Sequence, residues 1–320
     1  MRIYEIKPVS DADYAAYVNI LNNSWSTVQT TIANQRVDDQ QRQPHYVLRR
    51  FMAEHEDVAV GCGRFCHVDF MHHPQRFYWE VDVLPGYRRR GFGNAMYEHL
   101  MNELAAYNPI ELLVAASSDC PDGIRFVEKR GYTEAIRYQG ASLDTAHFDP
   151  IPFAGLLEGL QAEGIVIQSL AELAADPERD RKLYALEGQL QAEAPMIDAA
   201  TQAEFAIWQK NRSAENPFFL PDAYFVALYD GEYIGLSAVV ASQGDDRLET
   251  FFTGVQKAYR GRGIALALKL RVVEYAQALG NRTIITSTAS TNDPMRGINR
   301  RLGFVLQPAE LVYKKMLPTP

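Results

Sequence analysis

The chain has 320 residues, of which 47% are apolar and 22% charged, and its formal net charge is −8 at pH 7. The composition is that of a soluble globular protein, and the length exceeds that of most single hydrophobic cores, so two domains are predicted. The negative charge argues against duplex nucleic acid or an anionic membrane as the main partner, because both require a basic face. The opening segment MRIYEIKPVS has no apolar run typical of a secretory signal, and the three cysteines are sparse, so a cytoplasmic location is predicted.

The first 84 residues predict a strand, a helix and then further strands. RIYEIKPVSDADYAAYVNILNNSW resembles a strand, a turn and a helix, while DVAVGCGRFCHV and RFYWEVDVL have the apolar content of strands. The cysteines and histidines at 62, 66, 67, 72 and 73 lack the spacing of a zinc site. No metal is therefore predicted.

A glycine-punctuated basic loop, YRRRGFG at 87–93, follows these strands. The next residues carry an apolar stripe at helical spacing, Met96, Leu100 and Leu104, and the helix is predicted to end at Asn108–Pro109. A strand over 110–116, a short helix and a strand opened by Gly131–Tyr132 complete the unit. A segment with two prolines and a linking helix is predicted near 145–164.

The same order of elements returns in the second half of the chain. A strand–turn–helix segment begins at Gly164, and Asp230–Gly231 between apolar runs predicts a hairpin. An offset of 172 then maps YRRRGFG onto YRGRGIA at 259–265, and Gly131–Tyr132 onto Gly303–Phe304. The sequence therefore predicts two copies of one α+β unit.

In each copy a predicted strand is followed by a loop with the pattern R-x-x-G-x-(G/A), and this loop is followed by a predicted helix. The N–H groups of a helix N-terminus, its dipole and the arginines attract anions, and glycine lets a bulky anion approach the backbone. Neither copy has the Lys-Ser/Thr of a P-loop or the third glycine of a Rossmann fingerprint. The pattern therefore predicts a phosphate or pyrophosphate site of another kind.

The pattern V-x-x-x-x-R-x-x-G-x-(G/A) before an amphipathic helix closely resembles the pyrophosphate-binding segment of the GCN5-related N-acetyltransferases, the GNAT superfamily. The later Gly-Tyr and Gly-Phe pairs stand where that family has its Leu-Gly-Phe strand entry. The tandem arrangement resembles mycothiol synthase-like two-domain acetyltransferases, and the resemblance covers the core of both halves.

The resemblance implies acetyl-CoA as the donor. Its pyrophosphate would be held by the basic loops, and its pantetheine arm by the preceding strand ends. In the first copy these residues are Val83, Arg88, Arg89, Arg90, Gly91, Phe92 and Gly93. In the second they are Thr253, Gly254, Val255, Arg260, Gly261, Arg262, Gly263, Ile264 and Ala265, with Asn292 at a position often used near the cofactor.

Direct transfer also needs a base, and the family's glutamate position falls on Glu249 in the second copy. Along a regular strand Glu249 would share a face with Phe251, Thr253 and Val255. Glu80 is the candidate of the first copy, at another register. The family's thiolate-protonating tyrosine is replaced by Val127 and by Asn299, of which only the asparagine could contact the sulfur.

The sequence thus predicts an α+β fold with a mixed sheet in two tandem GNAT domains. The N-terminal domain at 1–150 would be the degenerate one, residues 151–163 a linking helix, and 164–320 the catalytic domain. The predicted activity is acetyl transfer from acetyl-CoA to a small primary amine, by a monomer or homodimer. The alternative is a catalytically degenerate protein that binds or senses CoA, or a structural module. The resemblance places residues 10–45 and 187–219 beside the acceptor site.

Overall fold

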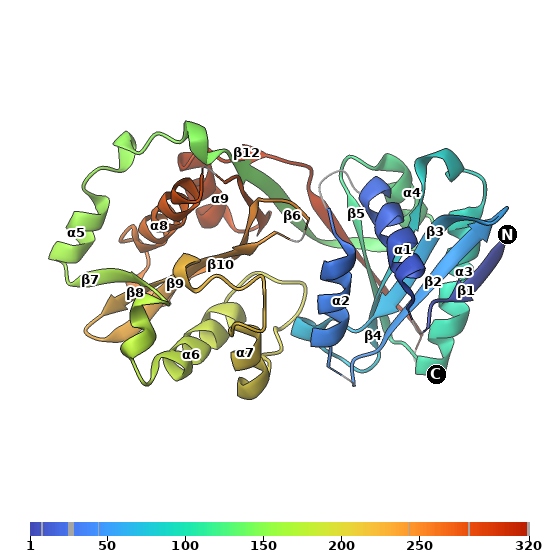
Figure 1. The fold of residues 1–320 in the computed structure, drawn as a ribbon, viewed down its shortest axis with the longest axis horizontal. Helices are drawn as coiled ribbons and strands as arrows, with labels where there is room; N and C mark the ends of the chain where they lie inside the picture. The colour runs from blue at the N-terminus through green and yellow to red at the C-terminus, as the bar shows by residue number, and fades with distance from the viewer. Residues whose placement is uncertain (8, 25–28, 44, 243, 281, 319–320) are drawn as a thin grey trace. The chain divides into compact units, whose positions relative to one another are not determined.

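The computed structural model describes residues 1–7, 9–24, 29–43, 45–242, 244–280 and 282–318 (Figure 1). Their contacts define two compact units. The first unit comprises Met1–Arg137 together with Pro308–Pro320, and the second comprises Tyr138–Gln307. The sequence predicted contiguous halves, whereas the structure places the last strand of the chain in the first unit.

The first unit contains a sheet with strands in the order β1-β2-β3-β4-β5-β13. Its elements are β1 (Arg2–Glu5), α1 (Asp11–Ser24), α2 (Ile32–Gln41), β2 (Leu48–His55), β3 (Val58–Cys66), β4 (Arg76–Val83), α3 (Phe92–Leu104), β5 (Glu111–Ser117), α4 (Pro121–Glu128) and β13 (Glu310–Met316). Only β4 and β5 run parallel. The C-terminal strand β13 pairs antiparallel with β5 over its whole length, which covers an edge that would otherwise expose backbone groups.

Helices lie on both faces of this sheet (Figure 1), and alternating residues of its strands pack into two different cores. Phe65, Phe77 and Trp79 point to the face covered by α3 and α4, where they pack with residues such as Met96. Cys62 points to the other face, toward Tyr17 of α1. Glu80 lies one residue beyond Trp79 and therefore belongs to the face covered by α1.

The second unit repeats this plan with strands in the order β6-β11-β10-β9-β8-β7. Its elements are β6 (Thr133–Leu143, entering the unit at Tyr138), α5 (Leu156–Ala162), β7 (Ile165–Ser169), α6 (Arg179–Ala192), α7 (Phe205–Asn211), β8 (Tyr224–Tyr229), β9 (Glu232–Ala241), β10 (Leu248–Val255), α8 (Ile264–Ala278), β11 (Ile284–Ala289), α9 (Asp293–Arg301) and β12 (Val305–Leu306). The predicted hairpin at Asp230–Gly231 is confirmed, since both residues have positive φ and join β8 to β9.

The two parallel strands of each unit separate soon after they start to pair. In the first unit the ladder joins Arg76–Tyr78 to Glu111–Leu113 and then stops. In the second it joins Leu248 and Glu249 to Ile284 and Ile285. Beyond these points the facing edges of the strands lose their ladder partners, which leaves backbone N–H and C=O groups for another strand-like molecule.

Among the described residues, no helix is both long enough and apolar enough to cross a membrane.

Candidate functional site: a donor-type loop in each unit

The two basic loops have the same backbone geometry. The left-handed residues are Arg89 (φ 62°) and Gly91 (φ 90°) in the first loop, and Gly261 (φ 81°) and Gly263 (φ 83°) in the second. The first arginine of each loop turns back onto the strand: Arg88 Nε donates to Val83 O at 3.0 Å, and Arg260 Nε to Val255 O at 2.9 Å. This arginine therefore fixes the strand-to-helix turn, and the glycines supply the conformation that the turn requires.

Each loop ends in a helix whose first turn is not capped by a side chain. Gly91 is the N-cap of α3 and Gly263 that of α8, and neither helix receives a side-chain cap. The N–H groups of the first helical residues consequently have no intrahelical partner. Phe92 and Gly93 in the first unit, and Ile264 and Ala265 in the second, lie where an anion would be bound.

The first loop borders a pocket of about 730 Å³. The pocket lies between the separated ends of β4 and β5, and the loop and α4 form its rim. Its cationic lining residues are Arg88, Arg89, Arg125, Lys129 and Arg130. The arginines and the free N–H groups give the rim the chemistry of a polyphosphate site, while Val81, Val83, Val114 and Ala116 supply an apolar floor.

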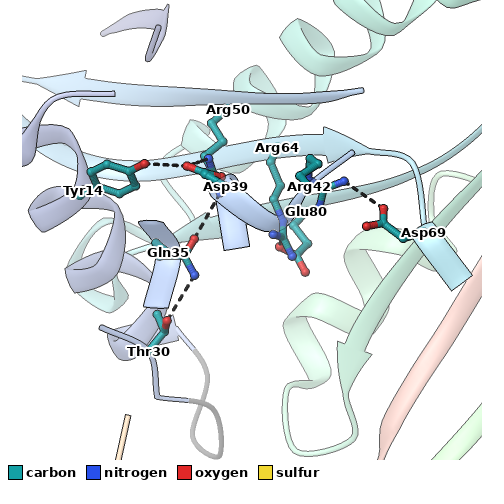
Figure 2. Close-up of polar contacts among 9 residues, drawn as sticks. All are labelled: Tyr14, Thr30, Gln35, Asp39, Arg42, Arg50, Arg64, Asp69 and Glu80. Carbon is teal, nitrogen blue, oxygen red and sulfur yellow. Dashed lines mark hydrogen bonds and ion pairs between the residues drawn. The ribbon is translucent and has the colours of Figure 1, made fainter. Parts of the chain in front are cut away.

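Glu80 lies at the inner end of this pocket, on the α1 side of β4. Its Oε2 accepts a hydrogen bond from Arg64 Nε at 2.6 Å, and its side chain is 16% exposed. Figure 2 shows Arg64 and Glu80 lying side by side, with Arg42 and Asp69 next to them. Burial and the neighbouring carboxylates of Glu80 and Glu310 raise the pKa of Tyr78 well above its usual range. Glu80 is therefore a partly buried carboxylate located where this pocket meets the α1 face of the sheet.

The second loop has different surroundings. Arg260 is ion-paired with Glu193, and Arg262 Nη2 lies 2.5 Å from Glu163 Oε2. A Cβ on Gly263 would lie 3.1 Å from Leu156 Cδ1, at the start of α5. The segment that links the two copies therefore packs against the second loop, and both of its exposed arginines are engaged.

A β-bulge corrects the predicted orientation of Glu249. The register of β10 against β9 shifts between Thr250 and Phe252. Leu248 and Val255 consequently both belong to the core beneath α8, although they are seven residues apart. Glu249 thus lies on the face opposite Thr253 and Val255, and the expectation that all three share one face is wrong, because a bulge reverses the alternation. Ser242 Oγ donates to Glu249 Oε1 at 2.9 Å.

The other polar residues predicted for the second copy have local partners. Thr253 Oγ1 lies 2.8 Å from Ser237 Oγ on the adjacent strand. Asn292 is the N-cap of α9, and its side chain accepts from Met295 N at 3.3 Å. Gly254 packs under α6, where a Cβ would meet Leu190 Cδ1 at 3.1 Å. These contacts stabilise the fold locally and leave the donor roles of these residues a prediction.

Asn299 borders a separate cavity of about 360 Å³ between α9 and the strands β6 and β12. Its Nδ2 donates to Thr288 Oγ1 at 3.2 Å, whereas its buried Oδ1 has no hydrogen-bond partner in the part of the chain that the structure describes. In the first unit Leu311 and Tyr313 occupy the strand positions that Gln139 and Ala141 hold here, and both are buried in the core. The cavity thus arises where smaller or polar residues replace two large ones.

Sequence reasoning missed Arg64, because it lies outside the repeated motif and sixteen residues before Glu80. The antiparallel register of β3 and β4 brings the two together. It also missed Arg125 of α4, together with Lys129 and Arg130 of the turn that follows this helix, all of which line the rim of the pocket. Of the segment 10–45, the described part forms α1 and α2, while residues 25–28 and 44 lie outside the described residues.

Comparison with known proteins agrees with this geometry. The family model described as "Acetyltransferase (GNAT) family" matches residues 14–132 and 193–304. The chain is 26% identical over 242 residues to mycothiol acetyltransferase of Geodermatophilus obscurus, covering 74% of this chain and 73% of that protein. It is 31% identical over 81 residues to N-acetylaspartate synthetase of Rattus norvegicus, covering 25% of this chain and 27% of that one.

Two solved structures share the fold across the chain. One is a tandem GNAT protein from the clavulanic acid biosynthesis pathway, with a TM-score of 0.75 and 17% identity, covering 100% of this chain and 99% of that one. The other is a GCN5-related N-acetyltransferase from Sphaerobacter thermophilus, with a TM-score of 0.70 and 16% identity, covering 98% and 95%. The prediction of an α+β fold in two tandem GNAT domains is confirmed, and the chain belongs to the GNAT acetyltransferase family as a tandem N-acyltransferase.

Proposed function

We propose that this enzyme transfers the acetyl group of acetyl-CoA to a small primary amine, and that its open donor site lies in the first unit. The observation that carries the proposal is the pocket of about 730 Å³ between β4 and β5, bordered by the basic loop and by Glu80. This reverses the assignment expected from the sequence, which favoured the second copy for its polar residues.

The residues of the first unit fit the donor. Free N–H groups at the start of α3 and the guanidinium groups of Arg88 and Arg89 suit a pyrophosphate. Arg89 also pairs with Asp122 at 3.0 Å, but its side chain is 75% exposed, and such surface pairs contribute little free energy. The separated edges of β4 and β5 offer backbone groups to the amide-containing pantetheine arm, as a sheet does to an added strand. When bound, acetyl-CoA supplies an acyl group already activated as a thioester.

Glu80 is proposed as the base. It would take a proton from the acceptor ammonium, and the freed amine would attack the thioester carbonyl, forming the C–N bond. The C–S bond then breaks, CoA leaves as its thiolate, and the nitrogen releases its remaining extra proton to solvent to give the amide. Val127 stands at the family's acid position and cannot donate a proton, so the thiolate would collect its proton from solvent; a thiol has a pKa of about 8.5, which makes it a tolerable leaving group.

A covalent route through Cys62 or Cys66 is disfavoured by burial. Both lie on the α1 face near Glu80, and burial raises the pKa of both thiols. A protonated, buried thiol is a poor nucleophile. Direct attack by the amine is the proposed mechanism.

The decisive experiment is calorimetric titration of acetyl-CoA into the wild type and into Gly93→Trp and Ala265→Trp. The two positions are equivalent, and neither has the positive φ that would strain a substituted loop glycine. A Cβ at Gly93 meets the Phe126 ring at an ordinary 3.7 Å, so the indole would enter the pocket without a backbone clash. Loss of binding in Gly93→Trp alone is the expected result.

Loss of binding in Ala265→Trp alone would return the donor site to the second unit and to Glu249. Loss of one of two stoichiometric sites in each variant would assign a donor to both units. A wild type that binds acetyl-CoA without ever releasing CoA in the presence of amines would instead support a CoA-binding or sensing protein. Circular dichroism of each variant verifies that the fold is intact.

A further inference from the structure

The α1 face of the first unit places a cation directly beside the proposed base. Arg64 and Glu80 are opposite one another on antiparallel strands, and their side chains point the same way (Figure 2). Arg64 is 26% exposed and Glu80 16%, so neither is sealed in the core. The pair is thus accessible from the side of the sheet that faces α1 and α2.

Arg64 has more donors than partners. A guanidinium carries five N–H donors, and within the described residues the structure gives Arg64 one hydrogen bond, from Nε to Glu80. Its electrostatic neighbours include Tyr17 and Cys66, and burial surrounds it with groups that solvate a cation poorly. A partly buried guanidinium with unused donors favours an additional anion.

Other arginines near this sheet have more side-chain partners than Arg64. Arg49 binds both Glu5 and Glu103, and Arg50 binds Asp39 and Gln35. Tyr14 donates to the same Asp39 at 2.6 Å (Figure 2). Each of these two arginines is thus held by two different side chains, whereas Arg64 binds only Glu80 within the described residues.

A second guanidinium lies beside the pair. Arg42, which ends α2, is 20% exposed and is held by Asp69 at 3.2 Å, while its buried Nε has no hydrogen-bond partner among the described residues. Arg42 and Arg64 both act electrostatically on the thiol of Cys66, so both lie close to the same point of the face. Two guanidinium groups therefore lie near Glu80 on this face.

We propose that the acceptor carries a carboxylate next to its amine, as a free amino acid does. Its ammonium would lie at Glu80 and its carboxylate at the free Nη groups of Arg64, with Arg42 adding positive charge. A planar guanidinium binds a carboxylate through two parallel hydrogen bonds, so the pair would also fix the orientation of the amine toward the donor pocket. This inference rests on the proposed function of the first unit and adds the substrate class.

The test compares acceptors that differ only in the carboxylate. CoA release is measured with phenylalanine and phenethylamine, with lysine and cadaverine, and with glutamate and 4-aminobutyrate, in which the carboxylate is displaced from the amine. Each free amino acid is expected to have a kcat/KM about 10- to 100-fold above that of its partner, the range of one charge-assisted bidentate contact.

Arg64→Met should raise KM for the amino acids by about the same 10- to 100-fold, so that their preference over the decarboxylated amines falls toward one, whereas any change in kcat that arises through Glu80 should be shared by both members of a pair. Arg64→Lys should recover part of the lost affinity for amino acids, because lysine keeps the positive charge but lacks the planar guanidinium that binds a carboxylate through two hydrogen bonds. Arg49→Met is the matched control: it removes an arginine from the adjacent strand, on the opposite face, and should not change the preference for carboxylates.

Equal use of both acceptors in every pair, or an equal loss for both in Arg64→Met, would overturn the proposal and leave the Arg64–Glu80 pair a structural one. Failure to acetylate any amino acid, while acetyl-CoA still binds the first unit, would also overturn it. Failure of the underlying function has a different signature, since Gly93→Trp would then retain acetyl-CoA binding.

Discussion

The two basic loops share a backbone and differ in what touches them. In both, an arginine binds the carbonyl of the strand-end valine and left-handed residues turn the chain into an uncapped helix. The first loop opens onto a pocket, whereas the second meets Leu156, Glu163 and Glu193. A shared motif can therefore border a pocket in one place and pack against neighbouring segments in another, since its surroundings depend on segments outside the motif.

The largest expected difference between the units concerns their carboxylates. Glu80→Gln should lower kcat by about 10²- to 10⁴-fold, because the amide cannot accept the ammonium proton, while Glu249→Gln should change it little. Steady-state CoA release at saturating acetyl-CoA measures both, and binding of acetyl-CoA should persist in each variant. The opposite ranking would place the chemistry in the second unit.

The second unit contains a buried charge network whose loss should lower the stability of the protein. Glu187 is 2% exposed and accepts hydrogen bonds from Trp208, Arg212 and Tyr224. Glu187→Ala should cost about 3–5 kcal/mol of unfolding free energy, because it leaves the guanidinium of Arg212 buried without its partner. Urea unfolding measures the loss. Replacing Glu187 and Arg212 together by apolar residues should recover much of it, and a small loss in the single variant would show that water reaches the site.

Lys269 should make the stability of the second unit depend on pH. Burial lowers the pKa of this amine to about 8, whereas its counterpart in the first unit is the neutral Tyr97. Below pH 8 the folded protein must charge a buried group, so stability should rise with pH between about 8 and the unfolded value of about 10.4. Lys269→Met should therefore stabilise the protein by about 2–3 kcal/mol at pH 7, and by less as the pH approaches 10. Thermal unfolding across this range tests the sign, and a pH-independent gain would contradict the buried amine.

The smallest effect is expected at the linker contact with the second loop. Glu163 and Arg262 are 55% and 35% exposed, so Glu163→Gln should change stability by less than about 1 kcal/mol. If this contact limits access, the same variant should strengthen acetyl-CoA binding at the second loop a few-fold while the first loop stays unchanged. Unaltered calorimetric titrations would show that Leu156 packing, not the ion pair, limits that loop.

Much of the fold was predictable from local pattern. Glycine spacing, the apolar stripe through Met96 and the turn at Asp230–Gly231 predicted elements that the structure confirms, because each depends on residues near one another in the chain. The face of Glu249 was not predictable in this way, since the bulge in β10 depends on its pairing with β9. The role of Arg64 was not predictable either, because this residue is brought next to Glu80 only by the pairing of β3 with β4.

By itself the sequence determined that two copies of one basic strand–loop–helix exist, since glycine, arginine and helical periodicity act over a few residues. Tertiary structure decided what surrounds each copy. It brought the linker onto Gly263, separated β4 from β5 around a pocket, and carried the last strand, β13, into the first unit. The physical reason is that a binding site needs empty space between elements distant in sequence, and packing alone determines where that space remains.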